Sequence, residues 1–375
     1  MKKDKLRIAQ IVGKMNSGGV ESVVLNYYKN IDRQKVQFDF IVDEDSAYIP
    51  REAIESLGGR VYIIPPYQHL FSYMINLIKL LKKNKYKVVH SHINSLSIFP
   101  LCAAKIANVK IRIAHSHSSA GSNELKRNII KYILRPFSKI FPTNFLACSE
   151  FAGIWLFGKN FMNTGEVKVL NNAIDTSKFS YNVEIRDKIR KYEKLENKFV
   201  VGHVGRFVNQ KNHSFLLKIF YEIHKLDQNS ILILLGDGPL RKSIEEEARD
   251  LGIENSVRFL GIKENVNEYM QAMDIFLLPS FYEGLPVVGV EAQTAGLRCI
   301  FSTNVTKEAK LTNNVEYLDL NDGEKTWAEA ALKYKNFERK NTAQIIIERG
   351  FDIKHEAKKL EKYYLELVEE RYGTD

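Results

Sequence analysis

The stretch PSFYEGLPVVGVEAQTAG, residues 279–296, determines how the rest of this chain is interpreted. An apolar run at residues 275–278 comes directly before it and predicts a buried strand. Proline is favoured at the first position of a helix, where its missing N–H removes no hydrogen bond, so Pro286 is expected to begin a helix. The stretch therefore predicts a strand, a turn and a helix, the repeating unit of a parallel α/β sheet.

Two carboxylates in this stretch, Glu283 and Glu291, stand eight positions apart. We expect Glu283 in the loop at the helix start and Glu291 inside the helix. Free N–H groups at a helix start attract anions such as phosphate, and a carboxylate can accept two hydrogen bonds from a vicinal diol. This geometry suits a nucleotide sugar. The alternative is an ordinary acid favoured by the helix dipole, although Glu291 lies in an unusually apolar helix, where a carboxylate needs a partner.

The length and composition indicate a globular protein with more than one domain. At 375 residues the chain exceeds one ordinary core. It has no apolar run of about 20 residues and no signal peptide, so we expect a cytoplasmic protein. The three cysteines are far apart and are interpreted as small buried residues in a reducing compartment, not as disulfides or metal ligands. They are Cys102, Cys148 and Cys299.

The net charge of +10 is unevenly distributed. Residues 1–180 hold 26 Lys and Arg against 13 Asp and Glu, whereas residues 181–375 hold 29 against 32. From Lys79 to Lys139 there are 13 basic residues and one acid, Glu124. This asymmetry predicts an anionic partner for the first half of the chain.

Residues 126–140, KRNIIKYILRPFSKI, form a basic amphipathic stretch. The basic residues recur at four-residue spacing with apolar residues between them: Arg127, Lys131, Arg135 and Lys139. Such a helix can lie on an anionic bilayer, or it can be an ordinary surface helix with a solvated face. The sequence leaves both interpretations open. Pro136 is expected to kink or end the helix.

Apolar, β-branched runs alternate with helical patterns along the whole chain. This alternation predicts parallel sheets in two doubly wound, Rossmann-like domains with a seam near residues 171–198. The predicted strands are residues 6–12, 38–42, 61–64, 88–90, 111–115, 145–148, 199–204, 231–235, 257–260, 275–278 and 299–302. The predicted helices include residues 20–31, 71–84, 214–226, 239–251, 266–272 and 355–372.

Two loops of the second domain carry further signals. VVGHVGRFVNQKN, residues 200–212, ends a strand and supplies Arg206 and Lys211, two cations that suit a diphosphate. We expect this loop beside the acidic stretch at one sheet edge; a solvated loop is the alternative. LLGDGPLRKSI, residues 234–244, is a glycine turn in which Gly236 would let backbone approach a ligand, and Asp237 would be a helix cap.

The first domain offers weaker signals after its strands. Gly18 and Gly19 precede a helix pattern but match neither GxGxxG nor a phosphate loop, so a purely structural turn is the alternative.

Histidines cluster at the ends of two predicted strands of this domain, where α/β proteins place ligands. They are His90, His92, His115 and His117. Two HxH pairs are compatible with a metal, but no carboxylate or cysteine lies nearby in sequence. A histidine that contacts sugar or phosphate is the favoured interpretation.

Taken together, these motifs resemble the family 4 retaining glycosyltransferases with the GT-B fold, especially bacterial capsule and exopolysaccharide enzymes. The similarity spans nearly the whole chain: GGVE, SHSS, ACSE, NNAID, GRFVNQKN, GDGPL and the pair of glutamates. The resemblance implies an acceptor-binding domain at residues 1–178 and a nucleotide-sugar-binding domain at 179–353, facing each other across a cleft. It also implies a helix at 354–375 that crosses back to the first domain.

The resemblance further implies a role for each matching residue of the second domain. Arg206 and Lys211 would contact the donor diphosphate, Glu283 the donor-sugar hydroxyls and Glu291 the ribose. Backbone positions of the donor loops would add contacts: Gly236, Gly284 and Leu285.

In the first domain, Gly18 and Gly19 would approach the diphosphate. His115 would lie beside the transferred sugar, with His117 as the neighbour to which this role could shift. The implied catalytic set is His115, Arg206, Lys211 and Glu283.

The implied reaction is transfer of a hexosyl or N-acetylhexosaminyl group with retention, from a donor expected to be a UDP-sugar. The acceptor would be a glycan or polyprenyl-linked glycan. No metal or cofactor is expected, because cationic side chains would neutralise the diphosphate. The alternatives are a sugar-nucleotide epimerase of the same fold and a non-catalytic partner subunit. Nucleic-acid binding lacks an aromatic-interleaved basic motif. Peripheral contact with an anionic membrane through residues 126–140 stays open.

Overall fold

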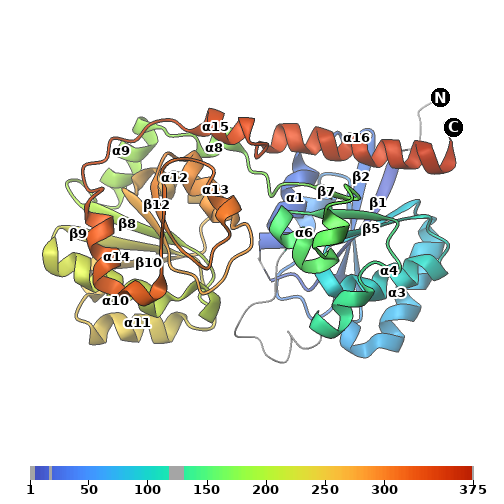
Figure 1. Cartoon of the computed structure of the whole chain (residues 1–375), viewed down its shortest axis with the longest axis horizontal. Coiled ribbons are helices and arrows are strands. Elements are labelled where there is room, and N and C mark those ends of the chain that lie inside the picture. Colours follow the sequence, from blue (N-terminus) through green and yellow to red (C-terminus); the bar gives the residue numbers. More distant parts are fainter. Residues whose placement is uncertain (1–4, 17–18, 118–130, 374–375) are drawn as a thin grey trace. The chain divides into compact units, whose positions relative to one another are not determined.

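The computed structural model describes residues 5–16, 19–117 and 131–373 and divides the chain into two compact units (Figure 1). The chain leaves unit 1 after Ala173, forms unit 2 from Ile174 to Phe351, and returns to unit 1 at Asp352. The sequence places these crossings after residues 178 and 353. Unit 2 is therefore inserted between two segments of unit 1.

Unit 1 contains a parallel sheet of seven strands in the order β3-β2-β1-β4-β5-β6-β7. The strand order reverses between β1 and β4, which is the point where doubly wound sheets bind ligands. The strands are β1 (Leu6–Gly13), β2 (Val36–Asp43), β3 (Arg60–Ile64), β4 (Val88–Ser91), β5 (Ile111–Ser116), β6 (Asn144–Ala147) and β7 (Val167–Val169).

Helices cover both faces of this sheet. One face packs Ala9, Ile11 and Val89 against α3, α4 and α6. The other face carries stacked and edge-on aromatic contacts that include Phe38 and Tyr364, and α1 packs with α16 on this side. The helices are α1 (Gly19–Asn30), α2 (Arg51–Glu55), α3 (Leu70–Asn84), α4 (Ile98–Ile106), α6 (Glu150–Phe157), α7 (Lys159–Met162) and α16 (Ile353–Tyr372).

Unit 2 contains a parallel sheet of six strands in the order β10-β9-β8-β11-β12-β13. Apolar clusters cover both faces. The strands are β8 (Phe199–Val204), β9 (Ser230–Leu235), β10 (Val257–Gly261), β11 (Ile275–Leu278), β12 (Arg298–Ser302) and β13 (Val315–Leu318). The helices are α8 (Thr176–Phe179), α9 (Val183–Tyr192), α10 (His213–Leu226), α11 (Arg241–Asp250), α12 (Val266–Ala272), α13 (Val287–Thr294), α14 (Gly323–Leu332) and α15 (Ala343–Glu348).

Helix α16 completes unit 1 with a segment from the far end of the chain. The side chain of Asp352 caps it by accepting a hydrogen bond from the backbone N–H of His355. Its apolar stripe buries Leu360 and Tyr364, and Glu361 pairs with Lys35 at 2.9 Å. The amphipathic pattern thus predicts the helix and its buried face.

Two short strands and one helix start differ from the sequence prediction. The prediction omits β7 and β13. In β7, Lys168 and Val169 are exposed, so this edge strand lacks the apolar run that marks a buried strand. Pro286 is the N-cap of α13, and the helix begins one residue later than predicted.

Within the described part of the chain, no helix combines the length and apolar character needed to cross a membrane.

Candidate functional site

In unit 2, the loop after β8 is fastened to the loop after β11. The backbone N–H of Phe281 donates to the carbonyl of Gln210 at 2.9 Å, and Gln210 Nε2 donates to the carbonyl of Tyr282 at 3.0 Å. Asn212 Nδ2 donates to the carbonyl of Pro279 at 3.1 Å. The cationic loop and the acidic stretch therefore lie side by side at the carboxyl edge of the sheet, as the sequence predicts.

Opposite charges meet at the junction of these loops. Lys211 Nζ lies 2.6 Å from Glu283 Oε1, and only 15% and 10% of these side chains are exposed. Ser280 Oγ donates to the same carboxylate oxygen at 3.1 Å. Arg206 is exposed and makes no hydrogen bond or ion pair with any described residue through its side chain. The carboxyl edge of the unit 2 sheet thus has the Arg206 guanidinium, which no described residue pairs, and the Lys211 ammonium, which is paired with the Glu283 carboxylate.

The glycine turn after β9 packs against the backbone of the cationic loop. Gly236 has φ +128°, and a Cβ there would lie 2.1 Å from the carbonyl oxygen of Gly205. A Cβ on Gly238 would lie 2.6 Å from the carbonyl oxygen of Phe207. Phe207 N–H also donates to the Asp237 carbonyl at 3.0 Å. These glycines allow two loops to touch; an approach of Gly236 to a ligand stays a prediction.

Glu291 is the fifth residue of α13 and is partly buried. Burial raises the pKa of its carboxyl to about 7, because removing the charged form from water is costly. Its carboxylate has no hydrogen-bond or ion-pair partner among the described residues. About two turns before Glu291, the Leu285 side chain packs with Ile174. The backbone N–H of Gly284 makes no backbone hydrogen bond to a described residue.

The four histidines of unit 1 form one buried cluster at the carboxyl ends of β4 and β5. Their rings stack or tilt against one another with centroids 3.9–5.4 Å apart. Burial lowers the pKa of each ring well below its ordinary value, and to about 3 for His117, where Asn172 partly offsets the effect. All four are therefore neutral at physiological pH. Both His115 and His117 belong to the cluster.

The predicted glycine turn of unit 1 is only partly described. Gly19 is the exposed first residue of α1, and a Cβ there would meet no atom within 4 Å. No contact in the described structure therefore requires glycine at this position. Gly18 lies outside the described residues, as does Arg127 of the basic stretch.

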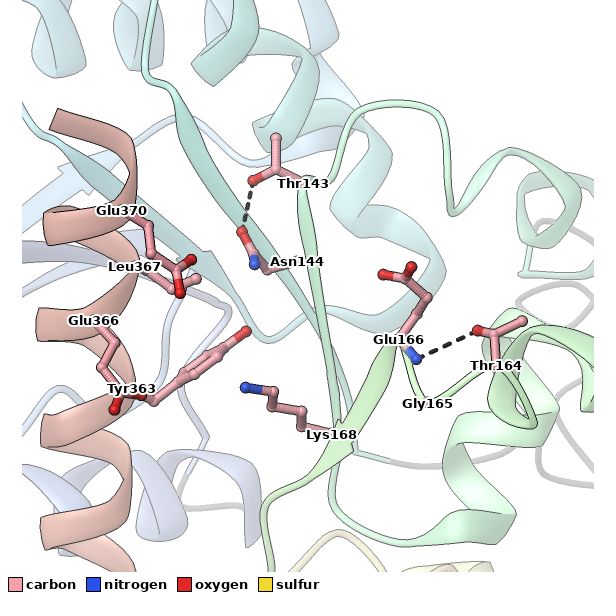
Figure 2. Close-up of a pocket in the computed structure, with 10 residues that line it drawn as sticks. All are labelled: Thr143, Asn144, Thr164, Gly165, Glu166, Lys168, Tyr363, Glu366, Leu367 and Glu370. Carbon is pink, nitrogen blue, oxygen red and sulfur yellow. Dashed lines mark hydrogen bonds between the residues drawn. The ribbon is translucent and has the colours of Figure 1, made fainter. Parts of the chain in front are cut away.

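A polar hollow of about 330 Å³ lies in unit 1, between the β6–β7 edge and α16. Figure 2 shows the residues that line it. Its lining includes Lys168, Tyr363 and the carboxylates of Glu166, Glu366 and Glu370, but none of the predicted site residues. All four charged residues are exposed, as is usual on a solvated surface.

Sequence reasoning missed three residues that the structure adds. Ser280 fixes Glu283, and Gln10 and Tyr364 contact the histidine cluster. Gln10 had a usable signal, because a polar residue inside the apolar run LRIAQIV is an informative buried polar group.

Comparison with known proteins identifies the family. Residues 17–178 match the model described as glycosyltransferase family 4, and residues 184–318 match the model described as glycosyl transferases group 1. The protein EpsF from Bacillus subtilis is 35% identical over 340 residues, covering 89% of this chain and 88% of that protein. The chain belongs to glycosyltransferase family 4.

A second relative and a solved structure add to this comparison. An Escherichia coli protein named UDP-Gal:alpha-D-GlcNAc-diphosphoundecaprenol alpha-1,3-galactosyltransferase is 26% identical and covers 97% of this chain and 98% of that protein. The solved structure of HepE from Anabaena in complex with UDP has a TM-score of 0.77 at 18% identity and covers 96% of this chain and 100% of that chain. The predicted fold of two Rossmann-like domains is confirmed.

Replacing Gly236 by alanine is expected to lower the free energy of unfolding of the glycosyltransferase by about 3 kcal/mol, because the new Cβ would overlap the Gly205 carbonyl at an unfavourable φ. Gly252→Ala is the matched control: Gly252 also has positive φ, +69°, but a Cβ there meets no atom within 4 Å. It should cost about 1 kcal/mol. Urea unfolding measures the free energy of unfolding of both variants. Equal losses of stability in the two variants would contradict the contact between the Gly236 turn and the cationic loop.

Glu291→Gln is expected to stabilise the glycosyltransferase, and more so at high pH. The folded pKa of Glu291 lies above its unfolded value, so stability is lost as pH rises from the unfolded pKa through the folded pKa. The variant should gain about 1 kcal/mol at pH 5 and about 3 kcal/mol at pH 8 in urea unfolding. Glu264→Gln, an exposed change in the same unit, is the control. A pH-independent gain would show that Glu291 ionises normally.

Proposed function

We propose that this glycosyltransferase transfers a sugar with retention from a UDP-sugar to a glycan or lipid-linked glycan acceptor in surface polysaccharide synthesis. The observation that carries the proposal is the edge of unit 2, where free Arg206 and paired Lys211 and Glu283 gather beside the Gly236 turn. The relative that names a UDP-galactose donor and an undecaprenol-linked acceptor, and the neighbour bound to UDP, support it.

In this proposal, different residues of unit 2 bind different parts of the donor. The Arg206 guanidinium presents a fork of donors that matches phosphate oxygens, and Lys211 adds a compact charge. Glu283 accepts hydrogen bonds from sugar hydroxyls, held in place by Ser280 and Lys211. Glu291, once ionised, accepts two hydrogen bonds from the ribose diol. Binding of the diol favours the ionised form and therefore lowers the raised pKa of Glu291.

The chemical step follows from stabilisation of the leaving group. The bond from the anomeric carbon to the diphosphate oxygen breaks as the acceptor oxygen bonds to that carbon on the same face. The acceptor hydroxyl gives its proton to the departing diphosphate oxygen, whose negative charge is stabilised by Arg206 and Lys211. These two cations take the role that a metal ion has in other enzymes, so the reaction needs none.

The donor test uses purified protein with UDP-, GDP- and ADP-sugars. We expect a thermal shift and slow donor hydrolysis with a UDP-sugar, unchanged by EDTA, and a product with the donor's anomeric configuration by proton NMR. Absence of binding to every nucleotide sugar would overturn the proposal. Binding without hydrolysis or transfer would favour a non-catalytic subunit.

Arg206→Gln should weaken UDP binding about tenfold or more, since hydrogen bonds to charged groups contribute about 1.5–3 kcal/mol. Arg258→Gln is the matched control, because Arg258 is an exposed arginine of the same unit and the variant loses the same charge. Isothermal titration with UDP measures both affinities. Equal affinities in the two variants would remove Arg206 from the donor site.

We also propose that unit 1 contacts anionic membranes through the basic stretch. Residues 131–134 are α-helical, and a 3-10 turn at Arg135–Phe137, which contains Pro136, directly follows them. Exposed apolar side chains lie among basic ones there: Tyr132, Ile133 and Phe137 are 53%, 61% and 45% exposed. Of the basic residues, Lys131 and Arg135 are partly exposed and Lys139 is exposed. Apolar burial combined with attraction to anionic lipid is what binds such segments to a bilayer surface.

Reversing the charges of Lys131, Arg135 and Lys139 to glutamate should abolish sedimentation with phosphatidylglycerol vesicles at low salt. Reversing three exposed lysines of unit 2, Lys188, Lys191 and Lys242, changes the net charge equally and should leave most of the sedimentation intact. Equal losses in the two triple variants would indicate attraction by net charge alone and contradict the role of the stretch.

A further inference from the structure

Gln10 contacts two groups with the two ends of its amide. It lies in β1 opposite His90 of β4, on the sheet face that also carries Phe38. Its Nε2 donates to Tyr364 Oη at 3.1 Å, and its Oε1 lies 2.7 Å from His92 Nε2. All of these groups are buried, so each must satisfy its hydrogen bonds within the protein.

Two arms of imidazole rings extend from these contacts. In the first arm, Tyr364 Oη lies 2.6 Å from His90 Nδ1, and His90 Nε2 lies 3.1 Å from His115 Nδ1. In the second arm, His92 Nδ1 lies 2.9 Å from His117 Nε2. Each arm ends at a buried ring nitrogen that has no hydrogen-bond partner within the described residues: His115 Nε2 in the first arm and His117 Nδ1 in the second.

The direction of every hydrogen bond follows from the Gln10 amide. Because burial keeps the rings neutral, each imidazole has one N–H and one bare nitrogen. The amide oxygen only accepts, so His92 carries its proton on Nε2 and accepts at Nδ1 from His117 Nε2. The amide nitrogen only donates, so Tyr364 gives its own proton to His90 Nδ1.

The same logic continues to the end of the first arm. Burial raises the pKa of Tyr364, which keeps its hydroxyl proton available as a donor. His90 then holds its proton on Nε2 and donates it to His115 Nδ1. His115 must carry its own proton on Nε2, the atom without a partner.

We propose that Gln10 and Tyr364 are positioning residues that hold all four histidines as the Nε2–H tautomer. As a result, His115 carries its proton on Nε2, and the family resemblance implies that this N–H donates to a sugar hydroxyl oxygen. The identity of that hydroxyl rests on the proposed function, but the tautomers do not. Turning the amide over would reverse every bond and make all four rings Nδ1–H. The arrangement therefore has two states, and the Gln10 orientation with Nε2 toward Tyr364 and Oε1 toward His92 corresponds to the Nε2–H state.

A metal ion is the competing use of these rings. Nitrogens of His90, His92 and His115 all lie within 4.8 Å of one another. However, the His90–His115 and His92–His117 distances are those of ordinary hydrogen bonds. A metal would occupy the bare nitrogens that accept these bonds. The test therefore includes metal analysis.

The tautomers can be read directly by long-range nitrogen–proton NMR of protein with labelled histidine, with the signals assigned residue by residue. We expect Nε2–H at His90, His92, His115 and His117. His203 is an internal reference of the opposite kind, because its Nδ1 lies 2.8 Å from the Leu277 carbonyl, which only accepts. An Nδ1–H form at any of the four, or a stoichiometric transition metal in the purified protein, would overturn the proposal.

Tyr364→Phe removes only the hydroxyl that directs the first arm. His90 and His115 should then show mixed tautomers, and kcat should fall about tenfold with donor KM little changed. Tyr363→Phe is the matched control: it makes the same change one residue away, in the hollow of Figure 2. Unchanged tautomers in Tyr364→Phe, or mixed tautomers in both variants, would overturn the proposal.

Two assays identify the hydroxyl and separate this proposal from the proposed function. A fall in donor hydrolysis without acceptor assigns the His115 contact to the donor sugar, and a fall in transfer alone assigns it to the acceptor. Mixed tautomers with neither rate changed would overturn the substrate contact. If no nucleotide sugar is used at all, the proposed function fails, while the NMR spectrum still decides the tautomers.

Discussion

Parallel strand pairing is the constraint on which the rest of this protein depends. Because all strands of a sheet run the same way, the loops that follow them gather at one edge. In unit 2 this brings together segments 72 positions apart, so that Lys211 and Glu283 form an ion pair. In unit 1 it places the histidines that follow β4 and β5 in one cluster with Gln10 of β1. If the strands did not run in the same direction, neither the Lys211–Glu283 pair nor the histidine cluster would be brought together.

The carboxyl edges of the two sheets differ in charge. At this edge unit 2 presents charge: the Arg206 guanidinium, which has no partner among the described residues, the Lys211–Glu283 ion pair, and the Glu291 carboxyl, whose pKa burial raises to about 7. The same edge of unit 1 carries polar groups without charge, because burial keeps the four clustered imidazoles neutral. A charged edge suits a diphosphate, whereas neutral donors and acceptors suit hydroxyl groups, which bind by direction more than by charge. This difference follows from burial rather than from the residue types alone.

The sequence predicts what depends on local pattern. Apolar runs predict the buried strands, and the motif around Glu283 predicts its position at the edge beside Arg206 and Lys211. What it cannot predict depends on packing between distant segments. The Gln10–Tyr364 contact joins residues 354 positions apart, and it requires the seating of α16 on the sheet. The short edge strand β7 escapes prediction because its residues are largely exposed, so burial imposes no pattern on them.

Helix α16 also has a consequence for the order in which the chain folds. Between β7 and α16 the ribosome must synthesise the whole of unit 2, about 180 residues, which takes roughly 10 to 40 s. During this time unit 2 can fold as a continuous segment, while the first segment of unit 1 lacks the helix that covers Phe38 and the hydroxyl that contacts Gln10 and His90. The first unit to begin synthesis is thus the last to be completed, and its aromatic face stays uncovered until α16 has been made.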